Sequence, residues 1–249
     1  VIYLKPEMAN LGRFLEGGNK KWIFLAASLF GAYLVSSTLG DNWIVVQQFF
    51  NRVGFGITDP VFSRDLGFYF FNLSFYQLLY SVLMLVLVLT TLMVGAVYLL
   101  KASAELFMID WKEFSFAKGH LAILIAAIFA LKAWGYKLAT FEILYSNNGA
   151  VFGATYTDIY ARLLSNQVLI VVAIVVALVI LANLFIRKLD WVLYSIGAWV
   201  VIAVVMGGIY PAAMQKFIVQ PNEYNKEKAY IERGIQYTRQ AYDLHQMET

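Results

Sequence analysis

Five long apolar stretches constrain this sequence more than any other feature. Each is about 20 residues long, which is the length that a helix rising about 1.5 Å per residue needs to cross a hydrocarbon core roughly 30 Å thick. Composition agrees, because 61% of the residues are apolar and only 14% are charged, which excludes a single water-soluble domain. The sequence therefore predicts an all-α fold, a polytopic transmembrane helical bundle. Its five predicted spans are residues 22–39, 75–100, 119–138, 167–186 and 191–210.

The first part of the chain also carries segments that are not predicted to cross a membrane. Residues 1–21 form a predicted cytoplasmic segment, and residues 22–210 form the predicted membrane domain. Between the first two spans, residues 41–56 place polar side chains on one helical face and apolar side chains on the other. We expect this segment to be a helix that lies in the outer interface or docks on the bundle.

The chain changes character after the fifth predicted span. Apolar density falls, and Pro211, Pro221 and Asn222 are predicted to break that span. Apolar residues then recur at helical spacing among charged ones, so we predict that residues 211–249 form an extracytoplasmic neck helix that leads to a further domain. Because the chain starts with Val rather than Met, we expect it to be an interior piece of a longer protein.

Lysine and arginine are unevenly shared between the two sets of alternate loops, which predicts the orientation of the chain. The poorer set holds Arg52, Arg64 and Arg162, with Lys137 at a helix edge. The positive-inside rule places the richer set in the cytoplasm, so we predict a cytoplasmic N-terminus and an extracytoplasmic C-terminus. The residues of the richer set are Lys5, Arg13, Lys20, Lys21, Lys101, Lys112, Lys118, Arg187 and Lys188.

Residue types that carry cofactor, metal or nucleic-acid chemistry are scarce. The sequence has no cysteine and two histidines, which disfavours disulfides, iron–sulfur clusters, thiolate zinc sites and haem. The net charge of +3 indicates no nucleic-acid partner. Phosphate-loop, hydrolase and zinc-protease signatures are all missing from the sequence. We therefore predict no catalytic, cofactor-binding or metal-binding residue, and an enzyme is the less favoured class.

Lys132 is the most unusual residue of the predicted spans. A lysine near the centre of a span costs roughly 2.5 to 3.5 kcal/mol, which nearly cancels the gain from its apolar neighbours. Lys132 either faces a cavity or an anionic lipid, or it extends to the membrane surface, which is the ordinary outcome. The five predicted spans contain no Asp or Glu, which weakens the hypothesis of an ion-coupled transporter.

Two loops supply the other candidate residues. Asp59 and Asp65 are two carboxylates that suit Ca²⁺, although an Asp before Pro more often starts a turn and a second Asp more often caps a helix. Asp158 and Arg162 follow Gly149 and Gly153 in residues 149–163. Such a glycine-containing loop either clasps a ligand or re-enters the bundle, or it simply allows close backbone packing.

Three stretches resemble an uncharacterised prokaryotic family of multi-pass membrane proteins of unknown function. They are DPVFSRDLGFYFF, GAVFGATYTDIYARL and YPAAMQKFIVQPNEYNKEKAYIERGIQYTRQAYDL, at residues 59–71, 149–163 and 210–244. The last stretch adds Asn222 and Glu223 to the candidate residues. The resemblance implies a longer protein with about seven spans followed by a large extracytoplasmic domain. It implies residence in a prokaryotic cell membrane or an internal energy-transducing membrane, and it transfers no role to any residue.

These observations favour an integral membrane scaffold or accessory subunit of a larger membrane complex, which anchors an extracytoplasmic domain. The expected partners are membrane lipids and other proteins of the complex. Two alternatives remain. One is a transporter or channel for an anion or a lipid, with Lys132 in its path, and the other is a lipid-modifying membrane enzyme that uses the loops of Asp59 and Asp158.

Overall fold

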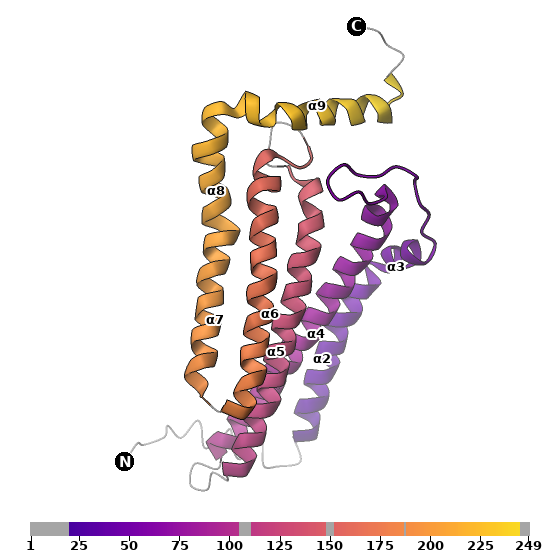
Figure 1. Cartoon of the computed structure of the whole chain (residues 1–249). Coiled ribbons are helices and arrows are strands. Elements are labelled where there is room, and N and C mark those ends of the chain that lie inside the picture. Colours follow the sequence, from indigo (N-terminus) through magenta and orange to yellow (C-terminus); the bar gives the residue numbers. More distant parts are fainter. Residues whose placement is uncertain (1–19, 105–110, 148–151, 187, 245–249) are drawn as a thin grey trace. The chain divides into compact units, whose positions relative to one another are not determined.

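Helices account for almost all of the ordered elements of this chain. Figure 1 shows the computed structural model, which describes residues 20–104, 111–147, 152–186 and 188–244. The described residues form helices joined by loops, and one isolated β-bridge between Thr58 and Asp65 is the sole strand-like pairing among them. The all-α prediction is therefore confirmed. Most of the predicted cytoplasmic segment, and residues 245–249 of the predicted neck, lie outside the described residues.

The chain divides into two compact units, of which the first comprises residues 1–131 and 180–186. Within it, the short helix α3 and the long helix α2 both pack against α4. Phe49 of α3 stacks on Phe75 of α4 at 4.0 Å between ring centroids. The elements of this unit are α2 (Lys20–Gly40), α3 (Trp43–Phe50), η1 (Phe68–Leu73), α4 (Ser74–Ala104), the first part of α5 (Trp111–Glu142) and the end of α6 (Leu163–Ile186).

The second unit comprises residues 132–179 and 187–249. Its buried positions include Ala133, Ala161, Ala173 and Ala177. Such small residues let helices pack closely, which matters in lipid because the hydrophobic effect does not drive helices together there. Besides parts of α5 and α6 it contains η2 (Ile143–Tyr145), η3 (Asp158–Arg162), α7 (Leu189–Val204), η4 (Val205–Ile209), α8 (Tyr210–Met214), η5 (Gln215–Val219), η6 (Gln220–Asn222) and α9 (Glu223–Ala241).

Four of the described helices are long and apolar enough to cross a membrane. They are Phe68–Tyr98, Ala117–Tyr145, Asp158–Ile186 and the helical run Leu189–Ala241. Large apolar side chains are exposed along them, for example Val171 and Leu178 of α6 and Val201 of α7. In a helix that crosses a membrane, lipid tails cover such side chains. The apolar part of α2, Leu25–Gly40, is shorter than these four, so the first of the five predicted spans, residues 22–39, remains a prediction.

The predicted break at Pro211 is wrong, because the helix continues through it. Proline lacks an N–H group and its ring collides with the carbonyl one turn earlier. Here the preceding element, η4, is wound as a wider π-helical turn, and Pro211 occupies the start of α8. The wider turn absorbs the misfit. The backbone leaves helical angles only at Asn222 (φ −142°, ψ 46°), where α9 turns sharply away from α8 (Figure 1).

The helix predicted at residues 41–56 is shorter than expected, since α3 ends at Phe50. The following residues form a loop in which Gly56 adopts a left-handed backbone angle (φ +71°). The backbone N–H groups of Phe55 and Gly56 donate to the Asp65 carboxylate. These hydrogen bonds replace the backbone hydrogen bonds that the two residues would make in a helix. The amphipathic pattern of residues 41–56 therefore extends beyond the end of α3, because tertiary contacts end the helix earlier than the pattern does.

Candidate functional site

The helix that leads into α6 begins at Tyr156 with a reciprocal cap. The Asp158 N–H donates to the Thr155 hydroxyl at 3.2 Å, and the Thr155 N–H and hydroxyl donate to the Asp158 carboxylate at 3.1 and 2.9 Å. This is a capping box, which satisfies N–H groups that have no partner in the first helical turn. Asp158 is 0% exposed, and its second oxygen pairs with Arg162 at 3.2 Å. The role of Asp158 in this structure is therefore to start and fix the helix.

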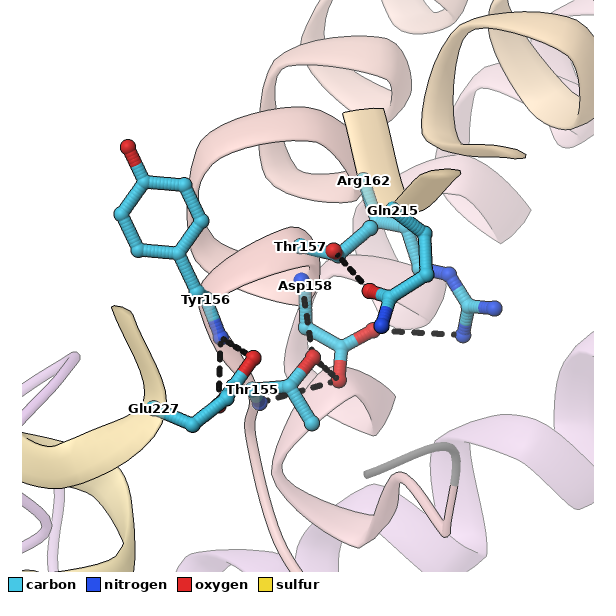
Figure 2. A network of polar contacts seen from close by, with 7 residues as sticks. All are labelled: Thr155, Tyr156, Thr157, Asp158, Arg162, Gln215 and Glu227. Carbon is cyan, nitrogen blue, oxygen red and sulfur yellow. Dashed lines mark hydrogen bonds and ion pairs between the residues drawn. The ribbon is translucent and has the colours of Figure 1, made fainter. Parts of the chain in front are cut away.

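A second carboxyl group reaches the same helix start from α9. The Tyr156 N–H donates to both oxygens of Glu227, at 3.2 and 3.3 Å, although the two residues are 71 positions apart in the sequence. Glu227 is only 5% exposed. A helix N-terminus carries partial positive charge, so it is a favourable place for a carboxyl group. Figure 2 shows the Glu227 carboxyl group at the Tyr156 N–H.

Two further contacts hold the same region together. The Thr157 hydroxyl donates to the side-chain carbonyl of Gln215 in η5. On the other side, the Lys226 ammonium lies 4.7 Å from the Tyr156 ring centroid and donates to the Tyr156 hydroxyl at 3.4 Å. These contacts join residues of α9, η5 and the helix start before α6 into one polar cluster, which Figure 2 shows without Lys226. The polar cluster consists of Thr155, Tyr156, Thr157, Asp158, Arg162, Gln215, Lys226 and Glu227.

The environment of Glu227 shifts its pKa upward. Burial is the largest cause of this increase, and the negative charges of Asp158 and Glu223 act in the same direction. The hydrogen bond from the Tyr156 N–H lowers the pKa but does not compensate for burial. A carboxyl group that binds its proton more tightly in the folded chain than in water makes the polar cluster sensitive to pH.

A cavity of about 330 Å³ lies beside the polar cluster, within the second unit. Its lining comes from the end of α5 with η2, from η3 with the start of α6, and from η4 and α8. The apolar part of the lining includes Ile143, Met206 and Pro211. The polar part consists of Glu142, Ser146, Arg162, Ser165 and Asn166. Arg162 thus lines the cavity and pairs with Asp158 at the same time.

Asp59, the first of the two predicted calcium candidates, organises its own loop. One carboxylate oxygen accepts N–H bonds from Val61 and Phe62 at 2.8 and 2.6 Å. The other accepts from the Arg64 N–H at 2.9 Å and the Tyr69 hydroxyl at 2.7 Å. Burial raises the pKa of Asp59, but these four hydrogen bonds outweigh it and hold the pKa below its usual value. The contacts match the turn interpretation.

Asp65 is similarly engaged by backbone groups. It accepts N–H bonds from Phe55 at 3.0 Å, Gly67 at 2.7 Å and Gly56 at 2.8 Å. These bonds lower the pKa of the Asp65 carboxyl. Asp65 closes the loop and precedes η1, in accordance with the capping interpretation. Among the described residues, no group of three His, Cys, Asp or Glu side chains is placed to hold a metal ion.

The remaining candidate residues lie apart from the polar cluster or at its edge. Lys132 is half-buried in α5 and is not among the residues that line the cavity. Asn222 lies at the start of α9 and accepts a hydrogen bond from the Asn225 amide at 2.7 Å. Glu223 is exposed in the first turn of α9 and influences the site through its charge near Glu227. Gly149, in the predicted ligand loop, lies outside the described residues.

Sequence reasoning missed four residues that the structure brings into this region, namely Glu142, Ser165, Gln215 and Glu227. Glu142 lies just beyond the predicted end of the third span, because α5 is longer than its apolar core. Glu227 and Gln215 carry no local signal, since their partners are 71 and 58 residues away. The pattern Thr-x-x-Asp at residues 155–158 was the available signal, because it is typical of a capping box.

Long apolar helices, exposed apolar flanks and a polar cluster at helix ends define this chain as part of a multi-pass helical membrane protein. The chain belongs to the Uncharacterised protein family (UPF0182), which it matches over residues 5–249. The predicted resemblance to an uncharacterised prokaryotic membrane family is thereby confirmed.

Related sequences come from diverse prokaryotes. The chain is 40% identical over 225 residues to a UPF0182 protein of Desulforamulus reducens, covering 90% of this chain and 24% of that protein. It is 42% identical over 231 residues to one of Pelotomaculum thermopropionicum, covering 90% and 25%. The chain therefore spans about a quarter of the length of these relatives. No solved structure matches it.

Proposed function

We propose that this region is the membrane anchor of a scaffold or accessory subunit. We also propose that it holds α9 in a fixed orientation, which positions an extracytoplasmic domain and its partners. The observation that carries the proposal is the contact between the buried Glu227 of α9 and the Tyr156 N–H, the first N–H of the helix that leads into α6. A helix that merely followed the membrane region would need no such attachment.

The attachment has several independent contacts. Glu227 binds the backbone of Tyr156, and Lys226 lies over the ring of the same residue. Gln215 of η5, which precedes α9 in the same helical run, binds Thr157. Each contact joins segments that are at least 58 residues apart in the sequence. Removing one partner of a buried hydrogen bond costs about 1 to 3 kcal/mol, so several such contacts together restrict the motion of α9. Restricted motion is what an anchor must supply.

Large side chains of α9 and of its C-cap residue are exposed and so are available to a partner. Tyr224 and Tyr242 are 70% and 74% exposed, and Ile235 and Tyr237 are also exposed. Aromatic residues are enriched at protein interfaces, because they bury a large area and lose little conformational entropy. The exposed tyrosines of α9 therefore suit contact with a protein partner or with the following domain.

The test replaces Glu227 by alanine in the full-length protein. We expect protease to cleave α9 faster, because the Tyr156 N–H loses its partner, and we expect recovery of co-purifying proteins from native membranes to fall severalfold. Glu232→Ala is the matched control, because Glu232 lies on the same helix and forms only an exposed ion pair with Lys228 at 3.9 Å. The control should leave cleavage and recovery unchanged.

Two results would contradict the proposal. Unchanged cleavage of α9 in Glu227→Ala would show that the contact does not anchor the helix. Faster cleavage with full recovery of the partner proteins would show that the orientation of α9 does not affect their binding.

A further inference from the structure

The cavity beside the polar cluster has the composition of a binding site. Its volume of about 330 Å³ lies at the lower end of the range for small-ligand sites, so it suits a compact polar group. Ile143, Met206 and Pro211 supply apolar walls, while Glu142, Arg162 and Asn166 supply charge and hydrogen-bonding capacity. Polar and charged side chains thus line the cavity beside apolar ones, and polar groups placed in this way fix the orientation of a bound ligand.

A buried hydroxyl at this cavity provides a second, independent observation. Ser165 lines the cavity and is 2% exposed, and its Oγ has no hydrogen-bond partner among the described residues. Burying a hydroxyl without a partner is costly, so such groups call for an explanation. A polar ligand atom in the cavity would provide the missing hydrogen bond.

The charged groups restrict the chemistry of the ligand. The lining contributes one carboxylate, Glu142, and one guanidinium, Arg162, whose charge is already balanced by Asp158 at 3.2 Å. Two carboxylates therefore accompany one guanidinium, which disfavours a plain anion. An ammonium group is attracted to the Glu142 carboxylate, and the planar fork of N–H donors of a guanidinium such as Arg162 suits phosphate oxygens. This combination fits a zwitterion better than an anion.

The position of the cavity indicates where such a zwitterion comes from. It lies where the apolar helix Ala117–Tyr145 ends and the apolar helix Asp158–Ile186 begins. The ends of membrane-spanning helices lie at the depth of lipid headgroups. We propose that the cavity binds an ammonium-bearing phosphate headgroup of the phosphoethanolamine type, with the ammonium at Glu142 and the phosphate at Arg162 and Asn166.

Two glycines offer a matched pair of variants for the test. Gly207 lines the cavity, whereas the adjacent Gly208 does not, and a Cβ atom added at either position meets no atom within 4 Å. Gly207→Leu should therefore fill the cavity without disturbing the fold, and Gly208→Leu is its control. Glu142→Gln removes the proposed ammonium partner while preserving the shape of the side chain.

The experiment titrates full-length protein in detergent with short-chain phosphatidylethanolamine or phosphatidylglycerol and counts bound lipids by native mass spectrometry. We expect selective binding of phosphatidylethanolamine, weakened about tenfold by Glu142→Gln, as for the loss of one charge-assisted hydrogen bond, and abolished by Gly207→Leu. Gly208→Leu should bind like the wild type.

A second arm of the experiment uses free phosphoethanolamine. Competition by the free headgroup at equal strength would assign the site to a soluble zwitterion of the same chemistry, whereas weak competition supports the lipid as the source. Equal binding of both lipids, or phosphatidylethanolamine binding that survives Gly207→Leu, would overturn the proposal.

Discussion

At the scale of single residues, the carboxylates of this chain act mainly on the backbone. Asp59 accepts four hydrogen bonds, Asp65 accepts three and Asp158 completes a capping box. The turn and cap interpretations of Asp59 and Asp65 could be made from the sequence, because Asp is common at such positions. Only the structure identifies the N–H groups that each carboxylate binds, since two of those at Asp65 are nine and ten residues away.

Gly67 is the residue whose replacement we expect to harm this loop most. A Cβ atom added there would lie 2.5 Å from the Val53 carbonyl oxygen and 2.9 Å from the Asp65 carboxylate. The obstacle includes backbone, so Gly67→Ala should cost about 1 to 3 kcal/mol, as overpacking does elsewhere. Thermal unfolding of the purified protein in detergent measures this loss.

Gly54 provides the comparison for that measurement. A Cβ atom at Gly54 would make only an ordinary contact, 3.5 Å from the Asp65 carboxylate. Gly54→Ala should therefore change the unfolding temperature much less than Gly67→Ala. Equal effects of the two variants would contradict the close approach seen at Gly67.

At the scale of elements, the main result is the way in which α9 joins the membrane helices. The helical spacing in residues 223–241 is visible in the sequence, and α9 lies within the predicted neck. Its attachment at Tyr156, in the helix that leads into α6, is not visible in the sequence. The reason is that Glu227, one buried glutamate among exposed charged residues, has no distinguishing pattern. The same holds for the wide turn before Pro211, which keeps the helix intact where the sequence predicts a break.

The raised pKa of Glu227 predicts how the attachment responds to pH. The folded chain binds this proton more tightly than the unfolded chain, so stability falls as pH rises from the ordinary value of 4.5 through the raised pKa, and it is regained as pH falls. Glu227→Gln keeps a carbonyl acceptor for Tyr156 but cannot ionise. We expect this variant to be more stable than the wild type at about pH 8 and nearly equal to it at about pH 4.

Unfolding temperatures of both proteins at the two pH values provide the measurement. Glu232→Gln serves as the control, because Glu232 is exposed and its ion pair is weak. A difference between Glu227→Gln and the wild type that is the same at both pH values would show that Glu227 does not titrate in this range.

At the scale of the whole molecule, apolar helices determine the class of protein, and loop charges predict its orientation. Four described helices meet the length and composition of a membrane span, and the chain belongs to a family of uncharacterised proteins. Orientation remains a prediction from the distribution of lysine and arginine. The absence of cysteine from this sequence makes that prediction convenient to test with introduced cysteines.

We expect Ser63→Cys and Thr238→Cys to react with an impermeant maleimide in intact cells, because both lie on the predicted outer side and both are exposed. Lys188→Cys, between α6 and α7, should react only after the cells are permeabilised. Full-length protein freed of any other cysteine is required. Labelling of Lys188→Cys in intact cells, or protection of Thr238→Cys, would reverse or refute the orientation.

The sequence by itself determined the all-α class, the apolar helices and the family. These properties follow from local composition and periodicity, which do not depend on distant contacts. It also carried the capping signal at residues 155–158, although that signal gave no hint of a cavity beside it.

Tertiary structure alone decided which polar groups meet. Glu227 reaches Tyr156 across 71 residues of sequence, and the cavity combines the end of α5 and the start of α6 with the middle of the last helical run. Such contacts depend on where helices end and how closely they pack, and neither is encoded within any single segment. The proposed anchor and the proposed headgroup site therefore both depend on the packed second unit and not on its separate helices.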